Sequence, residues 1–176
     1  MKALKKYLFP LAMIALTAIL WLIDAEMGRK ATDTMTFSLR EMIKILPPVF
    51  VLLGLLDVWV PRETMMKLMG EKSGIIGALL SIILGSAAAG PLYAAFPIAA
   101  VFMRKGVKFS NIMLFIGAWS TTKIPMLMFE LASMGPKFTL TRLAMSIIGI
   151  FGIAFVLGRI MDKKEIESIY QAAEKL

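Results

Sequence analysis

Long apolar runs alternate with short charged clusters along most of this chain. The runs occupy residues 7–23, 42–60, 74–103, 112–134 and 138–161. A helix needs about 20 apolar residues to cross a hydrocarbon core ~30 Å thick, and most of these runs approach that length. The pattern predicts an all-α, polytopic integral membrane protein. We expect four full transmembrane helices and one broken, re-entrant helical hairpin, which together make about five or six apolar helical segments.

The first run, residues 7–23, follows a basic start, which is also typical of a secretory signal peptide. The run is long for the apolar region of a signal, however, and it carries Trp21 near its end. No small-x-small cleavage site follows it. We therefore expect a retained transmembrane helix.

The second helix is expected to begin only after a polar loop. Residues 24–37 are polar and are interpreted as that loop. Ser38–Glu41 reads S-L-R-E, a capping-box pattern that indicates a helix start. Pro47 and Pro48 then predict a kink before the helix ends near Val60.

A short helix lying in the membrane interface is expected next. Pro61 suits the first position of a helix, and Gly70 suits the position that ends one. Methionines and a leucine between them supply an apolar face. A partly buried connector is the alternative.

The run at residues 74–103 is too long to be a single span. As one helix it would extend ~45 Å at 1.5 Å per residue, against a core ~30 Å thick. Gly90 and Pro91 divide it into two arms, neither of which spans comfortably. We expect a hairpin that enters and leaves on one side, with its tip buried in protein. Two short crossings stay open as an alternative, because they leave both ends on the same side.

A second interruption is expected at residues 120–125, which read S-T-T-K-I-P. The run that contains it follows a basic loop in which Ser110 or Asn111 could cap the helix. The last span, residues 138–161, carries four small residues suited to close helix packing, namely Ser146, Gly149, Gly152 and Ala154.

The organisation predicted from these runs is simple. Residues 1–161 form a single transmembrane domain, and residues 162–176 form a cytoplasmic amphipathic tail. The net charge is +8, and most Lys and Arg residues flank the apolar runs. Thirteen of these residues fall on the cytoplasmic side and six outside if the 74–103 hairpin returns to the side it entered. The positive-inside rule then places both termini in the cytoplasm, and anionic lipid explains the charge better than nucleic acid.

The composition limits the kinds of reaction and binding site that this chain can form. Hydrophobic residues make up 59% of the chain, and it contains neither cysteine nor histidine. Disulfides, thiolate metal sites and histidine-based acid–base chemistry are therefore excluded. No nucleophile–base pair, metal-ligand cluster or phosphate-binding glycine loop is recognisable. We expect no cofactor, no metal site and no enzymatic activity.

The tip of the predicted hairpin is the first candidate site. Breaking a helix at membrane depth frees backbone carbonyls and amides, which must bond to neighbours, water or a solute. The second half-helix begins near Pro91, so its first amides could face an anionic group. A simple packing kink is the alternative. The candidate residues are Gly90, Pro91, Tyr93 and Pro97.

The second interruption is the second candidate site. Lys123 lies well inside an apolar run, where an ionisable residue is costly and is a functional candidate by default. It could instead snorkel toward the interface or pair with an acidic residue. The candidate residues are Ser120, Thr121, Thr122, Lys123 and Pro125.

Two acidic residues, Asp57 and Glu130, complete the candidate chemistry. Either could carry a coupling proton or act as the counter-ion of Lys123. Each could also be a simple interfacial residue. Two interrupted segments in one small chain are typical of a transport site.

The stretch from Val60 to Phe129 resembles a predicted-permease family that includes the ArsP-type organoarsenical efflux permeases. The matching run is KLMGEKSGIIGALLSIILGSAAAGPLYAAFPIAAVFMRKGVKFSNIMLFIGAW, residues 67–119. It shares the family's order of a glycine-rich apolar helix, a small-residue tip, a proline and an apolar arm that ends in R-K-G. The resemblance implies a membrane permease.

Two departures from the family pattern matter. Full-length members look about twice this size, so the resemblance implies a half-size member that acts as a homodimer or a paired half-permease. Members linked to arsenicals tend to carry cysteine at the tip, whereas residues 90–93 here read G-P-L-Y. Thiolate capture of arsenic is therefore unavailable to this chain.

These observations together predict a permease domain in the cytoplasmic membrane. Its partners are expected to be the lipid bilayer, a second half-permease and a small solute. Lys123 and the half-helix amides favour an anionic or polar solute. The main alternative is a non-transporting membrane scaffold or accessory subunit, and a membrane-embedded enzyme is the weakest reading.

Overall fold

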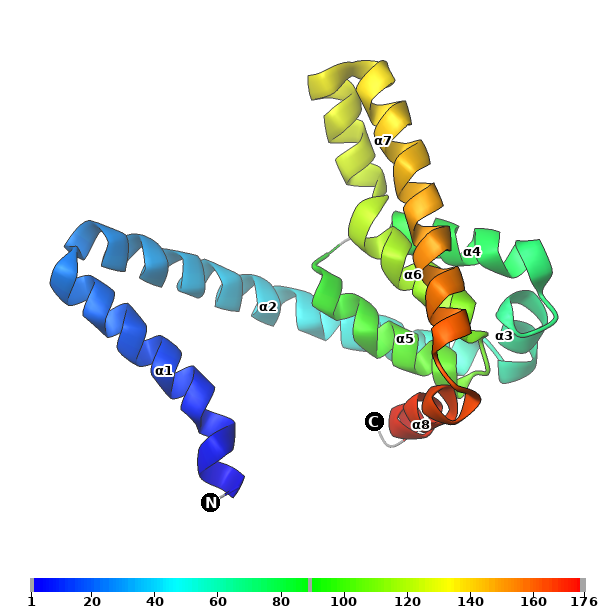
Figure 1. Cartoon of the computed structure of the whole chain (residues 1–176), viewed down its shortest axis with the longest axis horizontal. Helices are drawn as coiled ribbons and strands as arrows, with labels where there is room; N and C mark the ends of the chain where they lie inside the picture. The colour runs from blue at the N-terminus through cyan, green and yellow to red at the C-terminus, as the bar shows by residue number, and fades with distance from the viewer. Residues whose placement is uncertain (1, 89, 175–176) are drawn as a thin grey trace. The chain divides into compact units, whose positions relative to one another are not determined.

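The computed structural model describes residues 2–88 and 90–174, with side chains except those of residues 2–9, Leu53, Leu56 and Asp57. Every regular element within the described residues is helical (Figure 1), as the hydropathy pattern predicts. The chain forms two compact units, Met1–Pro48 and Val49–Leu176.

The first unit consists of two successive helices, α1 (Lys2–Ile23) and the first part of α2 (Ala25–Trp59). Asp24 alone separates the two helices. Its Oδ1 accepts hydrogen bonds from the amides of Glu26 at 2.9 Å and Met27 at 3.1 Å. Asp24 is therefore the N-cap of α2, because these are orphan amides of a first helical turn.

The predicted polar loop at residues 24–37 is wrong, and so is the helix start at Ser38. The segment is the first third of α2 and packs on α1, where the Trp21 indole donates to Thr32 Oγ1 at 3.0 Å. The segment is polar because this part of the helix lies outside the apolar run, not because it forms a loop. Pro47 and Pro48 lie inside α2, directly before the boundary between the two units.

The second unit begins with the last part of α2, residues 49–59, and the expected short helix follows it. This helix, α3 (Arg62–Met69), is preceded by Pro61 and ended by Gly70. A turn then leads into α4 (Gly74–Ala87), whose axis is bent by 108° from that of α3.

The remaining elements of the second unit follow in order. They are the 3₁₀ turn η1 (Leu92–Ala94), α5 (Ala95–Arg104), α6 (Phe109–Thr121), α7 (Ile124–Ile160) and α8 (Lys163–Glu174). The predicted caps Ser110 and Asn111 are wrong. Lys108 occupies the N-cap of α6 without a side-chain bond, and both residues lie inside the first turn.

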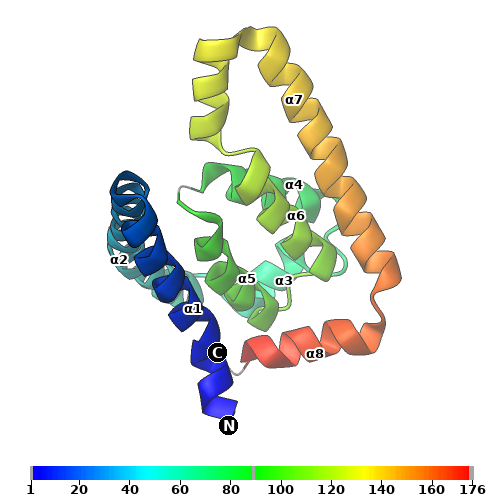
Figure 2. The same ribbon diagram turned by 60° about the vertical axis from the view of Figure 1, so that its left-hand side comes forward.

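Helix α7 consists of two arms. Gly135 has φ 81° and ψ 169°, a conformation that glycine tolerates and that breaks the helix. The first arm, residues 124–134, and the second arm, residues 137–160, run in opposite directions in both views (Figures 1 and 2). The second arm therefore returns along α6, as the two predicted apolar runs require.

The core of the second unit lies where α4, α6 and the second arm of α7 meet. Small residues line the buried face of α4 at a spacing of four, namely Gly77, Ser81 and Gly85. A Cβ atom on Gly85 would lie 2.4 Å from the carbonyl oxygen of Phe115. The buried cluster between α6 and the second arm of α7 consists of Leu114, Ala118, Ile150 and Ala154, and Ala78 and Ile82 of α4 pack against it.

The small residues predicted to pack closely on the last span behave differently from one another. Ala154 is buried in that cluster, whereas Cβ atoms built on Gly149 and Gly152 would meet open space. Close helix packing is therefore made by α4 rather than by these two glycines.

Among the described residues, one stretch, Phe109–Ile160, is long and apolar enough to cross a membrane. The bent pair α3–α4 would supply a second if it counts as one span. Four full spans thus stay a prediction. Large apolar side chains are exposed over both units, for example Leu22 at 88% in the first and Ile75 at 86% in the second, as expected for a surface in contact with lipid.

Candidate functional site

Both interruptions predicted from the sequence are present. Helix α4 ends at Ala87 and the chain resumes as η1 at Leu92, while α6 ends at Thr121 and α7 begins at Ile124. Gly90 has φ 123°, which a residue with a side chain rarely adopts. The first break therefore depends on glycine at this position.

The two breaks meet each other in space. Lys123 Nζ donates to the carbonyl oxygen of Gly90 at 2.5 Å. The hydroxyls of Ser86 and Thr122 are 2.7 Å apart, and Trp119 Nε1 donates to the carbonyl oxygen of Pro91 at 3.2 Å. We call this region the break crossing, defined by Ser86, Gly90, Pro91, Trp119, Thr122 and Lys123.

The break crossing follows from what broken helices leave unsatisfied. The carbonyls of Gly90 and Pro91, freed where the helix is broken, need hydrogen-bond donors. The ammonium of Lys123 and the indole of Trp119 supply those donors from the end of α6. Thr122 is buried and donates its hydroxyl proton to Ala118 O at 3.0 Å, so it accepts the hydrogen bond from Ser86.

The hydroxyls of Ser120 and Thr121, which precede Thr122, do not take part in the break crossing. Ser120 and Thr121 both donate to the carbonyl of Gly117 in their own helix, at 3.0 and 2.9 Å. Ser120 is exposed, whereas Thr121 is half-buried.

The remaining candidates of the two breaks have positional roles. Pro125 occupies the first turn of α7, where its missing amide proton costs nothing, and Pro97 lies in the first turn of α5. Tyr93, in η1, is 39% exposed.

Glu130 pairs with a residue that the sequence analysis overlooked. Its Oε2 is 2.6 Å from Arg142 Nε, and the two side chains are 7% and 22% exposed. Arg142 Nη1 also donates to the carbonyl of Thr121 at 2.7 Å, at the end of α6. Arg142 therefore ties both arms of α7 to the second break.

Arg142 could have been found from the chain reversal at Gly135. Glu130 lies five residues before that turn and Arg142 seven after it, so two opposing arms bring them together. Glu130 is thus the counter-ion of Arg142, whereas the ammonium of Lys123 bonds to the carbonyl oxygen of Gly90.

Asp57 lies on α2, and its side chain is outside the described residues, so its predicted role stays a prediction. Among the described residues, no group of three or more Asp or Glu side chains is arranged to hold a metal ion.

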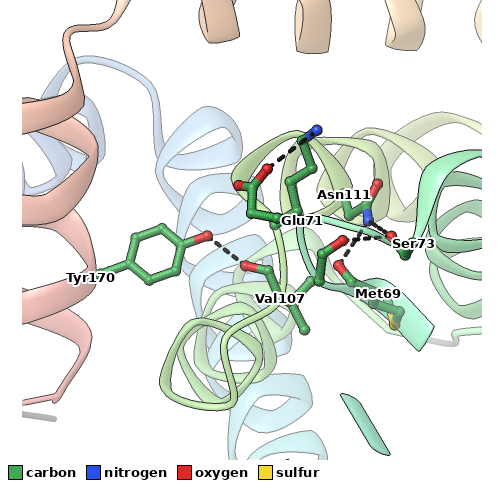
Figure 3. A network of polar contacts seen from close by, with 8 residues as sticks. Met69, Glu71, Ser73, Val107, Asn111 and Tyr170 are labelled. Atoms are coloured by element: carbon green, nitrogen blue, oxygen red, sulfur yellow. Dashed lines mark hydrogen bonds and ion pairs between the residues drawn. The ribbon is translucent and has the colours of Figure 1, made fainter. Parts of the chain in front are cut away.

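A second polar cluster lies at the opposite end of α6 (Figure 3). Asn111 Nδ2 donates to the carbonyl of Met69 at 2.8 Å and to Ser73 Oγ at 3.1 Å, which fixes the α3–α4 corner on α6. Tyr170 of α8 donates its hydroxyl to the carbonyl of Val107 at 2.5 Å. Helix α8 packs against α5 as well (Figure 2).

Tyr170 also borders an open cavity of about 770 Å³ between α8 and the start of α6. Burial, together with the smaller effect of the negative charge of Glu71, raises the pKa of Tyr170 to about 12. The proton of Tyr170 is therefore retained and available to hold the α5–α6 loop.

Comparison with known proteins identifies one family. The family model described as a predicted permease, of the ArsP type, matches residues 29–176, which include both breaks, Glu130 and Arg142. No curated protein matches the chain, and no solved structure does.

Proposed function

Because the chain belongs to the predicted-permease family, we propose that it is a half-size permease that moves a small, anionic or polar solute across the cytoplasmic membrane. It acts as a homodimer or a paired half-permease, spans the membrane several times, and keeps both termini in the cytoplasm. Its function is transport, without an enzymatic step.

The observation that carries this proposal is the meeting of two broken helices. Discontinuous helices that converge are where transporters bind their solutes, because their ends supply free backbone groups. Here the ends of α4 and α6 converge, and a lysine is bonded to a backbone carbonyl between them.

The mechanism follows from that bond. The ammonium of Lys123 is held by a neutral carbonyl, which an anionic solute can replace as the better acceptor. Solute binding then frees the tip at Gly90 from the end of α6. Once separated, the two broken segments can open to either side in turn.

Reconstituted vesicles test this proposal. A solute panel is first screened by thermal shift of the purified chain, and each hit is then followed as uptake or efflux. Lys123→Met is expected to abolish transport while the protein still assembles. The matched control is Lys137→Met, which removes an exposed lysine near the turn of α7. Undiminished transport by Lys123→Met would remove Lys123 from the site.

One observation favours the scaffold alternative. The donors and acceptors of the break crossing already satisfy each other, as they would in a packed core. Cysteines introduced at Tyr93 and Ser120, both exposed, separate the two functions. Labelling from the aqueous side at either position supports a pathway, whereas protection of both supports a scaffold.

A further inference from the structure

Few other charged residues lie on the helices around the ion pair of Glu130 and Arg142. Neither α4 nor α6 contains a charged residue, and α7 contains only Glu130, Lys137, Arg142 and Arg159. The pair also lies in the stretch that is long and apolar enough to cross a membrane. Charges in such a place are retained for function more often than for stability.

The donors of Arg142 are not fully used. Nε bonds to Glu130 and Nη1 to the carbonyl of Thr121. Nη2 is buried and has no hydrogen-bond partner among the described residues. A buried donor without an acceptor costs free energy, and a guanidinium favours carboxylate, sulfate or phosphate oxygens.

We propose that Arg142 recognises a small oxyanion in the transport site, and that Glu130 is its resident counter-ion and takes up one proton when the oxyanion binds. This inference rests on the proposed permease function and names both the solute class and the coupled ion.

Charge balance is the reason for coupling the two events. Arg142 keeps its proton at any physiological pH, so the pair is neutral when Glu130 is ionised. An oxyanion that binds Nη2 adds a negative charge to an apolar bundle, where an unbalanced charge is costly. A proton from solution that forms an O–H bond on Glu130 cancels that charge. A monovalent oxyanion and one proton therefore enter together.

Other charged groups do not replace Glu130 in this role. The helix packed beside the pair, α6, contributes only the Thr121 carbonyl, and Lys137 is exposed. Lys123 lies two residues after Thr121 and is bonded to Gly90, so it is a second cation at the same break. It strengthens the preference for an anion but offers no carboxylate to protonate.

Calorimetry on the purified full chain in lipid nanodiscs tests the inference. Acetate and inorganic sulfate are the probes, since neither changes protonation near neutral pH. Titrations in two buffers with different ionisation heats give the protons taken up per anion bound. The wild type is expected to bind at least one probe, with uptake of about one proton per anion bound.

Three variants separate the two roles. Glu130→Gln is expected to bind the anion without proton uptake. Arg142→Gln is expected to bind at least about tenfold more weakly, the loss typical of a hydrogen bond to a charged group. Arg159→Gln, an exposed arginine at the far end of the same arm, is the matched control and should behave as wild type.

A folding defect in Arg142→Gln is addressed by two further variants. Arg142→Lys keeps the charge, and Glu130→Gln combined with Arg142→Met removes both charges and leaves no unpaired ion. The lysine variant should retain binding and the double variant should lose it while unfolding at a similar temperature.

The inference is overturned if the wild type binds neither probe, if it binds one without proton uptake, or if Arg142→Gln binds as tightly as wild type. Failure here is distinct from failure of the permease proposal. Transport that survives Arg142→Gln leaves a permease with a different solute site, whereas absence of transport in every vesicle experiment removes the permease itself.

Discussion

The indole N–H of Trp119 donates to the carbonyl oxygen of Pro91 at 3.2 Å, so the last turn of α6 holds the tip that follows α4. Twenty-eight residues separate the two partners. Trp119 also packs edge-on against Phe115, with ring centroids 5.5 Å apart. The same side chain thus contributes to the core and to the break crossing.

Replacing Trp119 by Phe should loosen that tip. The variant keeps an aromatic ring for Phe115 but loses the donor to Pro91, at a cost of about 1 kcal/mol in the free energy of unfolding. We expect faster labelling of a cysteine at Tyr93 in the same background. Trp59→Phe, at an exposed position, is the control. Equal labelling rates in the two variants would contradict a role for the indole bond.

Thr122→Val should destabilise the break crossing while preserving side-chain shape. Its hydroxyl is the partner of Ser86 at 2.7 Å, and the variant leaves that partly buried hydroxyl without an acceptor. A loss of about 1–2 kcal/mol is expected from thermal unfolding in detergent. Thr122→Ser keeps the hydroxyl and should retain most of the stability, which a purely steric role would not predict.

Gly85→Ala and Gly152→Ala should have opposite effects. A Cβ on Gly85 would lie 2.4 Å from the backbone oxygen of Phe115, so α4 and α6 must separate, at about 1–3 kcal/mol. A Cβ on Gly152 meets open space, and alanine favours the helix by up to ~1 kcal/mol. Midpoints of thermal unfolding should fall for the first and stay level or rise for the second. The same sign for both would refute close packing by α4.

High pH should release α8 from the α5–α6 loop. The raised pKa of Tyr170, about 12 against 10.0, means that the folded state favours the protonated hydroxyl. This contribution is fully present below pH 10.0 and is lost as the pH rises through about 12. Tyrosinate absorbance during a pH titration measures it. Tyr170→Phe should lack this transition. A wild-type curve with no rise in tyrosinate absorbance above the ordinary tyrosine range would contradict the raised pKa of Tyr170.

Much of the break crossing could be predicted from local sequence. The run at residues 74–103 exceeds the length of one span, and Gly90 and Pro91 are the residues that break helices most readily. Lys123 stands out because it is charged within an apolar run. The meeting of the two breaks depends on bonds between residues about thirty positions apart, which no local pattern encodes.

The errors have equally physical causes. Residues 24–37 are polar, which predicts a loop, but the capping carboxylate of Asp24 is enough to start a helix there. The capping-box letters of Ser38–Glu41 occur in the middle of that helix, because any helix surface offers such spacings. Arg142 was missed since its partner is defined only after the chain reverses at Gly135.

The acceptor of Lys123 is a main-chain oxygen, and this has a consequence for genetics. Every amino acid at position 90 would bring a carbonyl, so no exchange of side chains there can repair the loss of the lysine. Second-site suppressors of Lys123 variants should therefore arise elsewhere, and positions 90 and 123 should show no covariation among relatives. A contact of this kind stays hidden from alignments and is visible only in three dimensions.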